Sequence, residues 1–180
     1  MSIEIKIDDE TKDLARQFPA AAQAVLNRTA ASAKTLVAKE LPKEYNVSAK
    51  MIKSRISVIK STRQSLVAIV RFSQKRFAPI LFANPQFPTT RRQAVLLEIK
   101  RGQKEMVDRK WFVQRGRKTG NLNVFTQEGK DRTNLTLMKW LTADKIFDMS
   151  KINPMITRFV ETKLSAELPR VIESLYRAGR

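Results

Sequence analysis

Apolar and charged positions alternate over residues 2–7, which is the period of a half-buried β-strand. Acidic residues follow and suit the first turn of a helix, which we expect to begin near Thr11. Pro19 interrupts or restarts that helix, because proline suits a first helical position and disfavours helix at the residue before it. From Pro19 to about Leu41, dense alanine and apolar residues at helical spacing predict a long helix, which Pro42 should end. Small residues on its apolar face would let another element approach closely: Ala22, Ala30 and Ala33.

A short basic helix and a run of strands are expected next. Ser48 is a candidate N-cap for a helix over residues 49–55. β-branched residues predict strands over residues 56–60 and 65–72, with polar residues between them. Further strands are expected over residues 78–82, 94–100, 111–113, 124–125 and 135–141, and turns or loops over residues 84–92, 102–108, 114–121 and around Gly129. Because of Pro79, the first of these strands should lie at a sheet edge.

The C-terminal segment has the pattern of a long helix that begins at Asn153. Its apolar residues share one side: Ile156, Phe159, Val160, Leu164, Leu168, Ile172 and Leu175. Pro169 lies inside it and should kink or split it. Strands that follow one another without intervening helices predict an α+β fold, with an antiparallel β-sheet core flanked by the N-terminal Ala-rich helix and the C-terminal helix. We expect a single domain over residues 1–180, made of a helical part (9–55), a β-rich basic middle (56–141) and a C-terminal helix (153–178).

The composition removes several classes of chemistry. The chain has no cysteine and no histidine, which excludes disulfides, thiolate nucleophiles and Ser-His-Asp or Cys-His catalysis. No apolar run approaches the roughly 20 residues of a membrane span, and the acidic, alternating N-terminus is unlike a signal peptide. We therefore expect a protein that is made in the cytoplasm and has no membrane partner.

The formal net charge is +18, and its distribution along the chain is uneven. Residues 50–118 contain 18 Lys or Arg residues and three acids, whereas the remainder contains 17 basic and 14 acidic residues. The middle of the chain is thus a cationic block between two nearly neutral ends. Such asymmetry points to a polyanionic partner for the middle.

Three other groups of residues could suggest a metal, nucleotide or catalytic site, but each has a simpler structural explanation. Clustered acids near the N-terminus suit a helix dipole more often than a metal ion: Asp8, Asp9, Glu10 and Asp13. The basic loop over residues 116–120 lacks the spacing and the strand-to-helix context of a phosphate-binding loop. Glu98, Glu105 and Asp108 suit structural ion pairs better than a catalytic carboxylate pair. We expect no catalytic residues, metal, cofactor or small-molecule ligand. A lysine-based nuclease would cleave DNA as the isolated protein, and we expect no cleavage.

Basic side chains in the loops and on polar strand positions are the candidate contacts for DNA or another polyanion. The nine that we assign to such a surface are Arg91, Arg92, Arg101, Lys104, Arg109, Lys110, Arg115, Arg117 and Lys118. Lys and Arg neutralise phosphates without reading sequence, and no helix-turn-helix, RNA-recognition or zinc-finger signature is present. The same charges could instead meet acidic neighbours in an assembly. Composition alone leaves both readings open.

Several segments, taken together, resemble the phage minor tail protein Z family. Residues 20–30 resemble the Ala-rich opening helix of that family, including its Asn-Arg step at Asn27-Arg28. Residues 45–56 resemble the basic segment that follows. Residues 154–156 and the Leu-Pro step within residues 167–170 resemble its closing helix. The order of these segments spans nearly the whole chain, whereas the middle strands match only in basic, β-rich character.

The resemblance implies a structural virion protein at the head-proximal end of a long phage tail, where it completes the tail for head joining and helps to place DNA. It also implies tail and neck proteins as partners and a homo-oligomeric ring, with a hexamer as the expected form, whose basic block could line a lumen that holds DNA. The alternative is a sequence-nonspecific nucleic-acid-binding protein that acts outside any virion.

Overall fold

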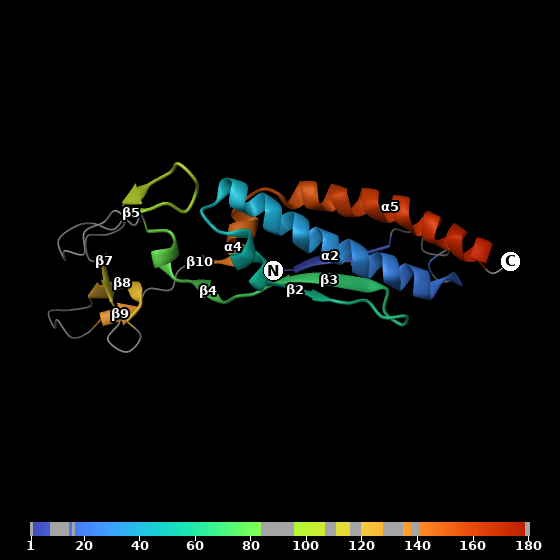
Figure 1. Cartoon of the computed structure of the whole chain (residues 1–180), viewed down its shortest axis with the longest axis horizontal. Helices are drawn as coiled ribbons and strands as arrows, with labels where there is room; N and C mark the ends of the chain where they lie inside the picture. The colour runs from blue at the N-terminus through green and yellow to red at the C-terminus, as the bar shows by residue number, and fades with distance from the viewer. Residues whose placement is uncertain are drawn as a thin grey trace.

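The computed structural model describes residues 2–7, 15, 17–83, 96–106, 111–115, 120–127, 135–137 and 141–178 of the chain. Figure 1 shows an elongated molecule in which the long helix α2 (Pro19–Glu44) lies between one three-stranded sheet and a second long helix, α5 (Asn153–Ala178). Smaller sheets gather at the end opposite the C-terminus. All strand pairs are antiparallel within the described residues, so the α+β fold with two flanking long helices is confirmed. The expected helix start near Thr11 lies outside the described residues.

Helix α2 is enclosed by the rest of the fold, because most of its alanine-rich circumference is buried. Its buried residues are Ala21, Ala22, Val25, Leu26, Thr29, Ala30, Ala33, Val37, Ala38 and Leu41. A narrow stripe that includes Ala24, Arg28 and Ala31 stays exposed. Small side chains allow this helix to contact the sheet and α5 at once.

The prediction that Pro42 ends α2 is wrong, since the helix continues to Glu44. A proline has a φ angle compatible with helix and here forfeits a backbone hydrogen bond only in the last turn. The amide of Tyr45 still donates to the carbonyl of Leu41 at 2.9 Å. The side chains of Leu41 and Tyr45 are both buried, and their burial favours the extra turn.

The main sheet has the strand order β1 (Ser2–Lys6), β3 (Val67–Phe72), β2 (Ile56–Ile59). The register places Ile5 opposite Ala68 and Ile56 opposite Phe72, and these four side chains are buried on the face toward the helices. The alternate positions form the outer face, where Ser57 lies opposite the exposed Arg71. The sequence predicted all three strands.

The smaller sheets depart further from the sequence prediction. Residues 78–82 form no strand: Pro79 starts the short 3₁₀ helix η1 (Pro79–Leu81), and the pairing occurs just before it, between β4 (Arg76–Phe77) and β10 (Leu141–Thr142). Proline suits the first position of such a turn and cannot donate to a ladder. Of the strand expected over residues 94–100, residues 94 and 95 lie outside the described residues, and the rest is confirmed only for β5 (Leu96–Leu97). Strand β5 pairs with β6 (Glu105–Met106) across a turn at Gly102.

A third small sheet joins β7 (Trp111–Arg115), β8 (Leu122–Gln127) and β9 (Leu135–Leu137). The run expected over residues 135–141 therefore contributes to two different sheets through β9 and β10. The expected loop over residues 84–92 and the turn around Gly129 lie outside the described residues.

Two helices complete the C-terminal part. The sequence prediction missed α4 (Ala143–Met149), whose Ala143, Ile146 and Phe147 are buried. Helix α5 is continuous through Pro169, which does not split it. Its apolar side is confirmed from Ile156 to Ile172, whereas Leu175 is 47% exposed.

Candidate polyanion-binding surface

Three of the nine predicted polyanion contacts lie within the described residues, and all three are exposed. Arg101 and Lys104 lie in the turn between β5 and β6, and Arg115 ends β7. The other six lie outside the described residues: Arg91, Arg92, Arg109, Lys110, Arg117 and Lys118.

Two of these three residues, Arg101 and Arg115, also make contacts within the chain. Arg101 covers the C-terminal end of α2, because its amide donates to the carbonyl of Glu44 at 2.9 Å and its Nε donates to the carbonyl of Pro42 at 2.7 Å. A cation there satisfies free carbonyls and suits the negative end of the helix dipole. Arg115 donates from Nη1 to the carbonyl of Gly120 at 3.0 Å and so closes the β7–β8 loop.

A second cationic region covers residues 45–83, all of which the structure describes. This segment contains eight basic residues and no acid. Six of them are exposed and form neither a side-chain hydrogen bond nor an ion pair in the part of the chain that the structure describes. We call these six residues the cationic belt: Lys50, Lys53, Lys60, Arg63, Arg71 and Lys75.

One end of the belt is fixed to α2 through the turn between β2 and β3. Ser61 is buried, and its amide donates to Oδ1 of Asn27 at 2.8 Å. Gln23 donates from Nε2 to the carbonyl of Ser61 at 3.1 Å. These bonds hold the turn, so that Lys60 and Arg63 project from a fixed backbone.

The other end of the belt is fixed by α3 (Ala49–Ser54) and the strand that follows it. The hydroxyl of Ser48 accepts from the amide of Met51 at 3.2 Å and caps α3, as predicted from the sequence. The guanidinium carbon of Arg55 lies 5.4 Å from the centre of the Phe77 ring. The amide of Ser73 donates to the carbonyl of Arg55 at 2.7 Å. These contacts join the start of β2 to the end of β3.

Several charged side chains on the helices have partners, whereas Lys39, Arg158 and Arg170 are exposed and form no ion pair within the described residues. Glu167 on α5 lies 3.5 Å from Nζ of Lys163 and 3.7 Å from Nη1 of Arg28 on α2. Lys163 also donates to Oγ of Ser32 at 2.6 Å, which links the two helices. Both members of the Asn27-Arg28 step therefore have partners, Asn27 at the β2–β3 turn and Arg28 on α5.

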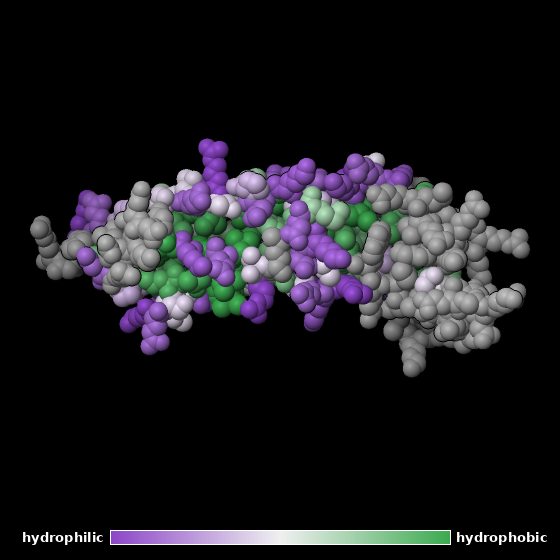
Figure 2. Space-filling view, turned by 180° about the vertical axis from the view of Figure 1, so that it is seen from behind, coloured by the Kyte–Doolittle hydropathy of each residue, from purple (hydrophilic) through white to green (hydrophobic). Residues whose placement is uncertain are grey.

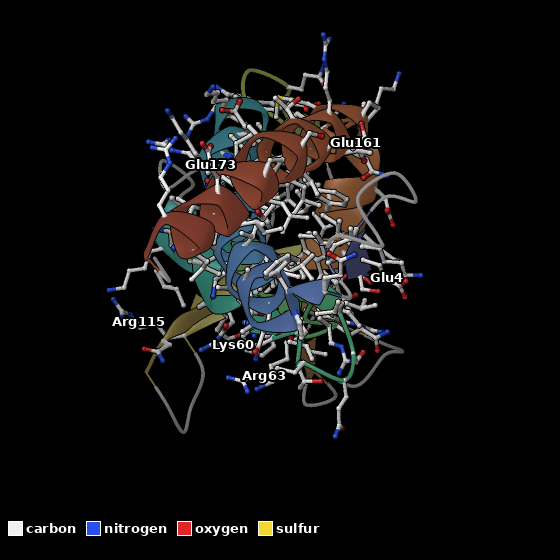
Figure 3. All side chains as sticks on the ribbon, turned by 90° about the vertical axis from the view of Figure 1, so that its right-hand side faces the viewer. Glu4, Lys60, Arg63, Arg115, Glu161 and Glu173 are labelled. Carbon is white, nitrogen blue, oxygen red and sulfur yellow. The ribbon has the colours of Figure 1, made fainter. Side chains whose placement is uncertain are left out.

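Figure 3 shows where four of the charged side chains lie. Glu161 and Glu173 lie along α5, whereas Lys60 and Arg63 lie on the side of the molecule away from α5. Figure 2 shows apolar surface on the rear face, between two hydrophilic margins. What distinguishes the belt is that its six cations, which have no partners within the described residues, lie in one segment that contains no acid, residues 45–83.

Tyr45 follows α2 and its side chain is fully buried, and by distance and angle its hydroxyl forms no hydrogen bond within the described residues. Burial raises the pKa of Tyr45, and the negative charge of the neighbouring Glu44 raises this pKa further. Lys100 lies 3.4 Å from the Glu44 carboxylate and 5.8 Å from the centre of the Tyr45 ring. This cluster joins α2 to the segment before β6 and offers no nucleophile to solvent.

Within the described residues, no group of three acidic side chains is placed to hold a metal ion, and no helix is long and apolar enough to cross a bilayer. A surface pocket on α5 is lined by Pro154, Met155, Arg158, Phe159 and Thr162, which contain no acid–base pair. The acids of the N-terminal cluster lie outside the described residues. Of the arrangements that the structure describes, the cationic belt has the clearest binding chemistry.

Comparison with known proteins identifies the family. The family model for prophage minor tail protein Z (GPZ) matches residues 7–178. A search of curated protein sequences and a search of solved structures each found no match. The matched range covers both long helices, strands β2 and β3 of the main sheet, and the belt. The chain therefore belongs to the prophage minor tail protein Z family of phage tail structural proteins.

Proposed function

We propose that this minor tail protein acts at the head-proximal end of the tail, where it completes the tail for head joining and helps to position DNA. The observation that carries this proposal is a tail-protein family match combined with a surface of unpaired cations. The six cations of the belt have no partners within the described residues, and the segment that holds them contains no acid. A tail lumen that holds DNA supplies the phosphates to compensate them.

We further propose that the chain forms a single domain and assembles into a homo-oligomeric ring around the tail axis, with a hexamer as the expected form. Head-to-tail contacts that close by rotation repeat every surface around the axis. The apolar surface on the rear face is of the kind that contacts between proteins cover. A ring would bring the predicted polyanion contacts between Arg91 and Lys118 into a repeated array, and an array that faces outward would contradict a role in the lumen.

The surplus of unpaired cations also supports a second candidate, a sequence-nonspecific nucleic-acid-binding protein that acts outside the virion. Protein composition of purified particles separates the two. A tail protein should be present in a fixed copy number per particle and should remain after a high-salt wash. A free DNA-binding protein should be absent from particles and abundant in the soluble lysate.

A further inference from the structure

We infer that the cationic belt is a binding surface for the phosphate backbone of double-stranded DNA. The inference rests on the proposed function for its setting, but the belt is defined by geometry alone. It adds residues before position 91 to the polyanion contacts that the sequence suggested. It also gives α3 and the β2–β3 turn a role that the family match does not state.

The belt has dimensions that suit a DNA strand. Lys60 and Arg63 lie at one end of the β2–β3 hairpin, and Lys53, Arg71 and Lys75 lie toward the other. Strand β2 has four residues, so at about 3.3 Å per residue the two ends are about 13 Å apart. Phosphates of one strand follow one another about every 3.4 Å along the duplex axis, so the belt spans several of them.

The chemistry of the belt favours nucleic acid over an acidic protein. Four of its six members are lysines, and lysine is depleted in protein–protein interfaces. Residues 45–83 contain no acid that could set the register of a protein partner. Lys and Arg side chains without partners neutralise phosphates irrespective of sequence.

The backbone beneath the belt is held in place at both ends, which separates this surface from an unstructured basic tail. Ser61 is bonded to α2 at one end, and the capped α3 is bonded through Arg55 to β3 at the other. The frame is ordered before binding, so DNA needs to order only the side chains.

The test compares two variants of the full-length protein that remove the same charge. The belt variant is Lys50→Gln, Lys53→Gln, Arg63→Gln and Arg71→Gln. The matched control removes two exposed lysines and two exposed arginines of the helices: Lys39→Gln, Lys145→Gln, Arg158→Gln and Arg170→Gln. Affinity for a 30-base-pair duplex is measured by fluorescence anisotropy across a salt series, with poly-L-glutamate as a second ligand. Circular dichroism melting checks that both variants are folded.

We expect the belt variant to bind the duplex about tenfold more weakly or worse, with a salt slope that is smaller by about 3.6, because each phosphate contact contributes about 0.9. The control should keep its slope within about one contact of the wild type. Equal losses in both variants would overturn the inference, as would preferential binding of poly-L-glutamate, which would indicate an acidic protein partner. A belt variant that cannot fold is replaced by the single changes Arg63→Gln and Arg71→Gln, each expected to reduce the slope by about 0.9. The duplex test and the particle composition are independent, so failure of one does not imply failure of the other.

Discussion

Replacement of Ala33 by leucine tests whether α2 is as tightly enclosed as the structure shows. Ala33 has an exposed fraction of 0% in the middle of the helix and belongs to the main core cluster. Extra methyl and methylene groups in such a site force neighbours to shift, at a cost of about 1–3 kcal/mol. Alanine and leucine have similar helix propensities, so the cost reports packing. For a chain of this size, 1 kcal/mol corresponds to about 2–4 °C in melting temperature.

The matched control is Ala31→Leu, which makes the same change two residues away on the exposed stripe of the same helix. We expect Ala31→Leu to change stability by less than about 0.5 kcal/mol and Ala33→Leu to lower the melting temperature clearly. Thermal melting followed by circular dichroism measures both. Equal melting temperatures for the two variants would refute the reasoning, because the Ala33 face would then be open in the isolated chain and available to a neighbouring subunit.

Three further predictions concern local contacts. Lys163→Ala removes the link between α2 and α5 and should cost about 1–3 kcal/mol in unfolding free energy. Arg177→Ala breaks an exposed ion pair and should cost less than about 1 kcal/mol. Similar costs for the two variants in denaturant titrations would argue against a half-buried link at Lys163. Ser48→Ala removes the cap of α3 and should cost about 0.5–2 kcal/mol, and an unchanged denaturation midpoint would contradict the capping role. Because the pKa of Tyr45 is raised in the folded state, stability should fall as the pH rises above about 10, where the unfolded tyrosine ionises first. Tyr45→Phe should reduce that fall and leave stability at pH 7 nearly unchanged, since the hydroxyl forms no hydrogen bond within the described residues.

Long, strongly patterned elements were predictable from the sequence, and short ones were not. Helix α2, the capped α3 and the three strands of the main sheet follow from periodicity and capping, which are local properties. Pro42 misled the prediction because burial of its neighbours outweighs one lost backbone bond. Helix α4 has only seven residues, too few for its pattern to stand out.

The candidate binding surface could be predicted from the sequence only in part. The sequence shows how many basic residues the cationic block contains. It does not show which of them have hydrogen-bond or ion-pair partners, because those partners are distant in the chain. Arg28 meets Glu167 across the two helices, and Arg101 meets the end of α2 across 59 positions. Lys60 and Arg63 have no such neighbour within the described residues, and only the fold shows this. The roles of Asn27 and Ser61 in holding the turn were likewise invisible without tertiary contacts.

Imaging of tailed particles by cryo-electron microscopy tests the central claim most directly, because it locates this chain along the tail axis. We predict a ring of density for α2, α5 and the main sheet at the head-proximal end of the tail, with the cationic belt directed toward the lumen. Density for the chain at the distal tip, or on the outside of the tail with the belt turned away from DNA, would contradict the account.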